Sequence, residues 1–415
     1  MWCLQSLDRA IMGILVEPIR LEFGLNDKQL GMITGLAYAV AFSVAVLPVG
    51  YLVDRGHRVR LLAGIAVIWS LMTATVGAAQ SFVTLLLARM GVGAASSGES
   101  PCSLSLIADY FPPRQRATAI GFAQFGAGIG TGLAAIIGGF AVSHLGWRAA
   151  CYIAAAPGLV MALVALAALP EPRSRPDRRA GSGELLSLRQ TLGFMGAQRS
   201  LAFLYFTAPL ATAAQWSLAT WLGAFLMRSH GLDIRAAGLA MGLYGFMGAL
   251  GNGAGGALID RMSRGAPRRQ LLISALGMMI AAVGVVVAML TTHVALAITL
   301  SLLVGLCSGA TQPIVSSNMI AVVGTRMRGL AVSALQLLMM LVGVGIAPFL
   351  IGALSDGFGG GGNLRYAILI VGSATWLIAS VNFFLAAKNI EADRERAADY
   401  DRAPSTTEQV CSGGT

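Results

Sequence analysis

Two carboxylates, Asp8 and Glu99, occur within long apolar stretches, whereas nearly all the other acidic residues, of 19 in total, lie in polar stretches or at the ends of apolar ones. A charge in hydrocarbon is costly unless it faces a cavity or a partner, so such residues are functional by default. Burial in a medium of low dielectric favours the neutral form of a carboxyl group. The chemistry that these two residues predict is the uptake and release of a proton near neutral pH.

Two arginines in the same apolar stretches, Arg9 and Arg89, are the cations available to pair with these acids. A proton or an anionic solute that competes for the charges would couple two fluxes in a simple way. The alternative is an ion pair between Asp8 and either arginine that only holds helices together. We therefore expect Asp8, Arg9, Arg89 and Glu99 to form the coupling or solute site.

Uncharged polar and aromatic residues within the apolar stretches are candidates for lining a cavity. Hydrogen bonds between helices are an equally good use for the carboxamides, and packing or interfacial anchoring an equally good use for the aromatic rings. The candidates are Tyr38, Ser96, Gln124, Gln215, Trp216, Gln312, Asn318 and Gln336.

The elements that must position these residues are membrane helices. The chain of 415 residues is 56% hydrophobic and only 12% charged, about half the charged fraction of a soluble protein. Its 52 glycines also suit a membrane, where small residues let helices approach closely. Apolar runs long enough to span lie near 1–22, 30–53, 61–79, 82–110, 118–143, 149–169, 201–227, 235–259, 271–290, 294–323, 329–355 and 365–387.

These runs divide the chain into two bundles of six helices, 1–169 and 201–388, with a polar central loop at 170–200 and a polar tail at 389–415. Most of the 29 basic residues fall in the stretches that are cytoplasmic when both termini are inside. We therefore expect a multi-pass protein of the cell inner membrane with cytoplasmic termini. The net charge of +10 reflects this topology and does not indicate a nucleic-acid partner.

A repeat supports the division into halves. Gly50-Tyr51-Leu52-Val53-Asp54-Arg55 ends the second run, and Gly256-Ala257-Leu258-Ile259-Asp260-Arg261 ends the eighth. The same type of string six helices later is what a parallel duplication predicts.

Together with Arg89-Met90-Gly91-Val92-Gly93 and Gly146-Trp147-Arg148, these strings resemble motifs of the major facilitator superfamily. The chain is most similar to the bacterial spinster-like branch, although organic-anion symporters share several strings. The strings that resemble that branch are Leu7-Asp8-Arg9, Val16-Glu17-Pro18-Ile19, Asp54-Arg55-Gly56-His57-Arg58, Ser105-Leu106-Ile107-Ala108-Asp109-Tyr110-Phe111-Pro112 and Phe225-Leu226-Met227-Arg228-Ser229-His230-Gly231.

The resemblance implies two six-helix bundles around a central cavity that work by alternating access. Many spinster-like members are thought to carry lipids or amphipathic molecules with proton coupling. Their fourth-helix glutamate corresponds to Ser96 here, and Glu99 follows three residues later. Either Glu99 replaces that carboxylate one turn nearer the cytoplasm, or coupling is altered or lost. The first helix is also shorter than in the family, so either Met1 is not the true start or the cytoplasmic half of this helix is missing.

The resemblance further implies a cytoplasmic gate. In the family a loop aspartate caps a helix of the opposite half, and an arginine pairs with an acid of the fourth helix. The matching residues would form a latch that holds the outward-facing state, unless their charges only fix the topology. They are Asp54, Arg55, Arg58, Asp109, Asp260 and Arg261.

Signals for catalysis are weak. The string Gly251–Gly256 fits a nucleotide-binding pattern, but it lies in an apolar helix without a preceding strand, and packing explains it better. The four histidines lack metal-ligand spacing. We expect no enzyme, metal or cofactor.

The sequence predicts a monomeric, proton-coupled secondary transporter of an amphipathic or anionic organic solute in the lipid bilayer. The alternatives are an uncoupled facilitator or organic-anion symporter of the same fold, and a membrane receptor or assembly factor that moves nothing.

Overall fold

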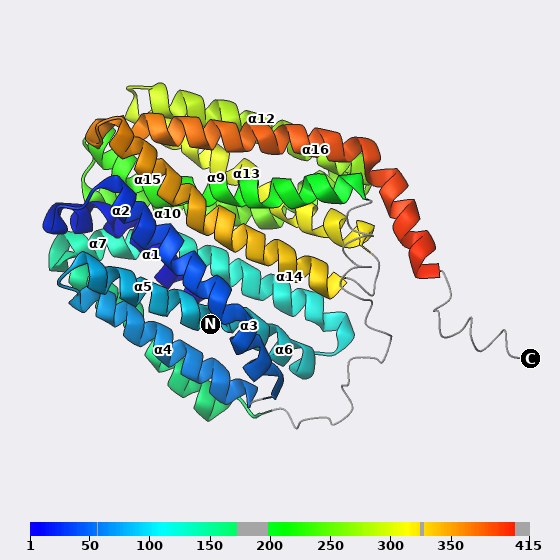
Figure 1. Ribbon diagram of the computed structural model, residues 1–415, viewed down its shortest axis with the longest axis horizontal. Helices are drawn as coiled ribbons and strands as arrows, with labels where there is room; N and C mark the ends of the chain where they lie inside the picture. The colour runs from blue at the N-terminus through cyan, green and yellow to red at the C-terminus, as the bar shows by residue number, and fades with distance from the viewer. Residues whose placement is uncertain (56, 172–197, 324–327, 403–415) are drawn as a thin grey trace, which may run out of the picture.

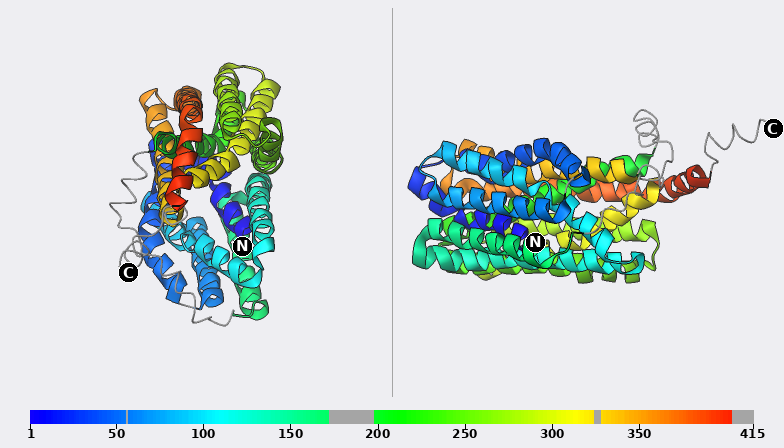
Figure 2. Two further views of the ribbon diagram at one scale, coloured as in Figure 1. Left: turned by 90° about the vertical axis from the view of Figure 1, so that its right-hand side faces the viewer. Right: turned by 90° about the horizontal axis from the view of Figure 1, so that it is seen from below.

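The computed structural model describes residues 1–55, 57–171, 198–323 and 328–402, and no strand occurs among them. The helices lie side by side along the long axis of the molecule (Figure 1). The first half of the chain, blue to teal, forms one bundle, and the second half, green to red, forms the other (Figures 1 and 2). The predicted fold class, an all-α membrane protein of two helical bundles, is confirmed.

The described residues of the N-terminal bundle form six consecutive rods. Gly146, whose φ of 84° lies in the left-handed region, divides the long helix α7 into two of them. The rods are α1 (Trp2–Phe23), α2 (Asp27–Gly31) continued by η1 (Met32–Leu36) and α3 (Ala37–Arg55), α4 (Arg58–Ala78), α5 (Phe82–Ser96) with α6 (Glu99–Tyr110), and the two parts of α7 (Pro113–Ala168).

The described part of the C-terminal bundle forms six more rods. They are α9 (Arg199–His230), α10 (Ile234–Leu250) continued by η2 (Gly251–Gly255) and α11 (Gly256–Ser263), α12 (Pro267–Leu290), α13 (Val294–Val322), α14 (Arg328–Leu338) continued by η4 (Met339–Ile346) and α15 (Ala347–Gly357), and α16 (Leu364–Arg402), which follows the short turn η5 (Gly361–Asn363). Eight stretches of the described residues are long and apolar enough to cross a membrane, one of them including both parts of α7.

Two boundaries differ from the predicted ones. The fourth span, predicted as one helix over 82–110, is interrupted at Ser97 and Gly98. Pro101 explains the interruption, because proline has no N–H for the carbonyl four residues earlier and its ring clashes with that carbonyl. Helix α16 runs on to Arg402 and so includes part of the predicted polar tail. Residues 172–197 of the predicted central loop and 403–415 of the tail lie outside the described residues.

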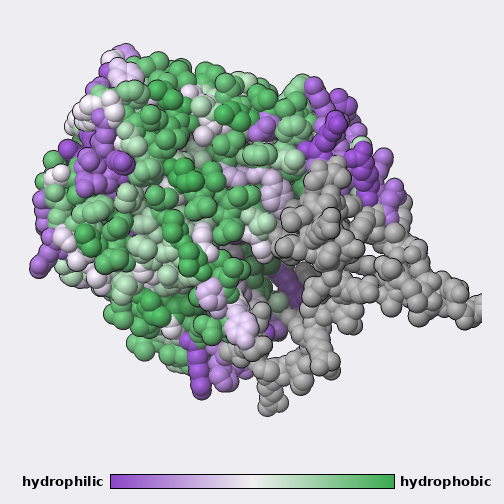
Figure 3. All heavy atoms as spheres, viewed as in Figure 1, coloured by the Kyte–Doolittle hydropathy of each residue, from purple (hydrophilic) through white to green (hydrophobic). Residues whose placement is uncertain are grey.

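The surface of the bundles suits lipid. Apolar side chains cover the middle of the face seen in Figure 3, and polar ones gather toward its ends. Leu47 and Phe122 are 80% and 78% exposed, which water would penalise and a bilayer does not. The protein is therefore a multi-pass membrane protein.

The two bundles are in contact along one seam where α7 packs against α10, along a second seam where α2 and η1 pack against α15 and η4, and also where α1 packs against α9. We call the end of the molecule that holds the turns at Gly24, Gly231 and Gly359 the outer end, following the predicted topology, and the opposite end the inner end. The second seam lies toward the outer end, where Gly31 of α2 abuts the backbone of Phe349.

Candidate functional site

A large cavity lies between the two bundles, with about 2080 Å³ of space including its open mouth. Its wall takes side chains from both halves, among them Arg9 of α1 and Gln215 of α9. The wall extends toward the inner end as far as Gly121 of α7 and Val332 of α14. The cavity therefore faces the inner end, while the outer end is closed by the seam between α2 and α15.

Arg9 is the one charged side chain among the described residues that line the cavity. Its guanidinium carbon lies 4.0 Å from the centre of the Trp216 ring, within the range of a cation–π contact. The Arg9 Nε atom is buried and has no hydrogen-bond partner among the described residues. No ion pair within 4.0 Å joins Arg9 to an acid among the described residues, and a guanidinium can form charge-assisted hydrogen bonds to an anion, so the wall is suited to a negatively charged group.

The structure places five of the residues predicted to line a cavity in this wall: Gln124, Gln215, Trp216, Gln312 and Gln336. Sequence reasoning missed Asn252 and Tyr244, which line it too. Asn252 was hidden within a glycine-rich string that was explained by packing, although a carboxamide in an apolar helix is itself a signal. Tyr244 donates from its hydroxyl to the Gln215 carbonyl at 3.1 Å.

Tyr38, Ser96 and Asn318 are not among the described lining residues, and the structure places all three in the protein interior. The Tyr38 ring packs against the Arg89 guanidinium, with 5.4 Å between the guanidinium carbon and the ring centre. Asn318 donates from its side-chain nitrogen to the Gln270 carboxamide oxygen at 3.0 Å and to the Ile314 carbonyl at 2.9 Å. One bond to the neighbouring helix α12 and one to its own helix α13 thus occupy this side-chain nitrogen without a cavity.

Asp8 lies in the interior of the N-terminal bundle, 3% exposed, and does not belong to the described wall. Its carboxylate accepts a hydrogen bond from the Thr73 hydroxyl of α4 and interacts electrostatically with Arg89 of α5. Among the described residues no ion pair within 4.0 Å joins Asp8 to either arginine. Arg89 itself is 1% exposed, and its Nε and Nη2 atoms have no described partner.

Glu99 is the first residue of α6, directly after the interruption of the fourth span. It is fully buried and does not line the cavity in the described structure. The Ser103 hydroxyl donates to its Oε1 atom at 3.2 Å, while Oε2 has no described partner. Arg9 interacts with it electrostatically. The structure thus brings Glu99 and Asp8 each near an arginine, but behind the wall and not in it.

Two contacts of charged residues at the inner end, both between described residues, each lie within one half. Arg58 pairs with Asp109, and the Gln270 carboxamide donates to Asp260 at 2.5 Å. Arg261 is exposed. The side chains of Asp54 and Arg55 lie outside the described residues, so the predicted latch between the halves stays a prediction.

An acid that sequence reasoning missed, Glu171, lies beside this pair. Its two carboxylate oxygens accept from the backbone N–H groups of Arg58 and Val59 at 2.8 and 2.9 Å. The carboxylate therefore caps the N-terminus of α4, where a negative charge is stabilising.

Comparison with known proteins places these features in context. The family model described as Major Facilitator Superfamily matches residues 2–348. An "MFS-type efflux pump" of Mycolicibacterium smegmatis is 28% identical over 94% of this chain and 91% of its own length. A "Probable L-galactonate transporter" of Escherichia coli is 26% identical over 94% and 88%.

A solved structure with the same arrangement of helices is described as a bacterial homolog to the human lysosomal transporter Spinster, inward-facing and unoccupied. It superposes with a TM-score of 0.83 at 25% identity and covers 95% of this chain and 96% of its own.

Proposed function

Because the chain belongs to the major facilitator superfamily, we propose that it is a secondary transporter that moves a small organic anion by alternating access. The observation that carries the proposal is the charge of the cavity wall. One cation, Arg9, and a set of carboxamides line it, and no acid lies among the described lining residues. A solute with one negative group and further polar or apolar parts would satisfy this wall.

The names of the relatives agree with an organic solute. One relative is described as an efflux pump and another as a "Probable L-galactonate transporter". Galactonate is a hydroxylated carboxylate, which carboxamides and an arginine are suited to bind. The similarity to an inward-facing structure supports a cavity that opens to the cytoplasm. We propose the inner membrane as the location, with the inner end on the cytoplasmic side.

Proton coupling is part of the proposal and rests on Asp8. Asp8 interacts electrostatically with Arg89 and precedes Arg9 directly in the chain. An anion bound at Arg9 and a charge on Asp8 repel each other through a medium of low dielectric. Protonation of Asp8 would therefore favour solute binding, and solute binding would favour protonation.

An uncoupled facilitator is the second candidate, because Asp8 and Glu99 lie behind the described cavity wall and not in it. A proton could reach them only after a change of conformation. In a facilitator, solute flux would leave the pH on both sides unchanged.

Counterflow in proteoliposomes tests transport itself. Purified protein is reconstituted into vesicles loaded with one unlabelled compound, and uptake of the same labelled compound is followed. A panel of hydroxy acids, aromatic acids, lysolipids and drugs covers the solute classes, and Arg9→Gln is the matched variant. The proposal is supported if the native protein exchanges an anion and the Arg9→Gln variant exchanges it much more slowly. A compound that binds tightly and never exchanges would favour a receptor instead.

A further inference from the structure

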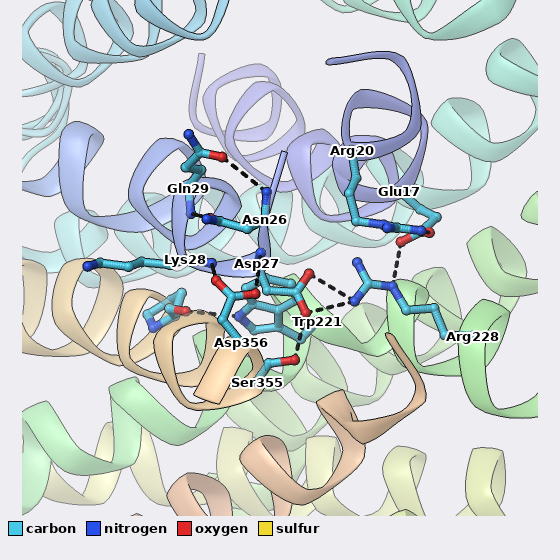
Figure 4. Close-up of polar contacts among 11 residues, drawn as sticks. Glu17, Arg20, Asn26, Asp27, Lys28, Gln29, Trp221, Arg228, Ser355 and Asp356 are labelled. Carbon is cyan, nitrogen blue, oxygen red and sulfur yellow. Dashed lines mark hydrogen bonds and ion pairs between the residues drawn. The ribbon is translucent and has the colours of Figure 1, made fainter. Parts of the chain in front are cut away.

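A buried ion network joins the two halves at the outer end, and the proposed transport cycle does not yet use it (Figure 4). Arg228 of α9 donates from Nε to the Glu17 carboxylate of α1 at 2.6 Å and from Nη1 to the Asp27 carboxylate of α2 at 2.9 Å. Its side chain is 6% exposed, against 10% for Glu17 and 3% for Asp27. One arginine of the C-terminal half thus holds two carboxylates of the N-terminal half.

A second set of bonds crosses the same seam. Ser355 of α15 donates its hydroxyl to the Asp27 carboxylate at 2.6 Å. The Asp356 carboxylate accepts from the backbone N–H groups of Asp27 and Lys28 at 2.9 and 2.8 Å (Figure 4). An aspartate of one half therefore caps the start of a helix rod of the other half, where a negative charge is stabilising.

The two carboxylates that contact Arg228 differ in what they would lose if the halves separated. Glu17 accepts from Arg20 of its own helix at 2.6 Å, so it keeps a cation. Asp27 receives both Arg228 and Ser355 from the opposite half and would lose both. Separation also leaves Arg228 without a partner among these residues. A buried pair that loses one member leaves an uncompensated charge, which is strongly unfavourable until water enters.

We propose that Arg228, Asp27 and Asp356 form the outer gate of the transporter, with Asp27 as its main anchor in the N-terminal half. The inference rests on the proposed alternating access. The gate stabilises the state seen here, closed at the outer end and open at the inner end. A substitution that weakens the gate shifts the population toward a state that is open outward. The size of the shift is set by the stabilising free energy that the closed state loses and the open state does not.

Distances between spin labels across the outer end test the gate without any solute. Labels are attached to cysteines that replace Gln80, in the turn after α4, and Thr292, in the turn after α12, both exposed and in opposite halves. The native cysteines are first replaced by alanine; they are Cys3, Cys102, Cys151, Cys307 and Cys411. Pulsed electron resonance on protein in lipid nanodiscs then gives the distribution of outer-end distances.

We expect Asp27→Asn and Asp356→Ala each to raise the population with the longer distance about tenfold, and Glu17→Gln to raise it less, because Glu17 contributes only one bond across the seam. The matched control is Arg235→Gln, an exposed arginine that also crosses between the halves but donates to the neutral Ser143 hydroxyl at 2.8 Å. It should leave the distribution unchanged.

The gate would be contradicted if Asp27→Asn and Arg228→Gln left the distribution of outer-end distances unchanged. It would also be contradicted if these variants and the Arg235→Gln control shifted the distribution equally. Should Arg228→Gln fail to fold, Arg228→Lys serves in its place, since lysine keeps the charge but not the fork that reaches two carboxylates. The distance measurement needs no transport. If the protein moved none of the tested solutes, the proposed function would be contradicted, but the distances would still test the gate.

Discussion

The Arg9 guanidinium of α1 lies against the Trp216 indole of α9, with 4.0 Å between the guanidinium carbon and the ring centre. The one charged residue on the described cavity wall thus contacts the opposite half of the protein. A solute that binds Arg9 would change this contact, and with it the packing between the halves. In the proposed cycle Arg9 would therefore both bind the solute and form a contact that separates when the halves move.

Replacement of Arg9 should change selectivity for charge. We expect Arg9→Gln to weaken binding of an anionic solute about 10- to 100-fold, because a hydrogen bond to a charged group is worth about 1.5–3 kcal/mol. Arg9→Lys should fall between this variant and the native protein, since it keeps the charge but not the flat guanidinium. Ligand-induced thermal stabilisation of purified protein measures the change, and a neutral analogue of the same solute should be affected little. Equal losses for both analogues would contradict an electrostatic role for Arg9.

Replacement of Asp8 should separate exchange from coupling. Asp8→Asn can still accept from the Thr73 hydroxyl but can no longer bind and release a proton. We expect counterflow, which needs no net proton movement, to remain within about threefold of the native rate, an effect below about 0.7 kcal/mol. Accumulation driven by a pH gradient should be lost. An Asp8→Asn variant that still acidifies the vesicle interior as solute enters would rule out this residue as the proton carrier, and Glu99→Gln would then be examined in the same assay.

The fold could be predicted because its main determinants are local. Apolar runs of about 20 residues specify spanning helices, and the repeated strings at Gly50 and Gly256 predict two equivalent halves. The interruption before Glu99 was missed although Pro101 signals it, since an unbroken run of apolar residues on both sides favoured one helix. Helix α16 continues past the predicted end at 387 because hydropathy indicates where a chain leaves the bilayer, whereas helix propensity and contacts decide where the helix ends.

The site could be predicted only in part, because a membrane helix that is apolar on every side does not reveal which face meets a cavity. Gln124 and Asn318 look alike in the sequence, yet one lines the cavity and the other bonds to Gln270. The outer network shows the same limit. The strings that contain Glu17 and Arg228 were singled out for their resemblance to a family, but a contact between residues 211 positions apart cannot be inferred from a single sequence.

Asp393 should matter for stability and not for transport. It is 1% exposed and accepts at Oδ2 from the Ser200 backbone N–H at 2.7 Å and from the Ser200 hydroxyl at 2.6 Å. The polar extension of α16 thus caps the start of α9. We expect Asp393→Ala to destabilise the folded protein by about 1–3 kcal/mol, the cost of a buried donor left without a partner. Thermal unfolding in detergent measures this against Glu391→Ala, an exposed acid on the same helix. Equal melting temperatures for the two variants would exclude the capping role.

Closure of the outer end should depend on the absence of a side chain at Gly31. A Cβ there would lie 2.6 Å from the Pro348 carbonyl oxygen and 2.7 Å from the Phe349 Cα atom, both backbone atoms of the opposite half. Gly50, on the same rod, has nothing within 4 Å of the equivalent position. Gly31→Ala must therefore move the halves apart at the outer end, whereas Gly50→Ala should add up to about 1 kcal/mol of helix stability. We expect Gly31→Ala to lengthen the distance between labels at positions 80 and 292 and to slow counterflow at least tenfold, a barrier change of about 1.4 kcal/mol. If both alanine variants matched the native protein in distance and rate, the seam would not govern the cycle.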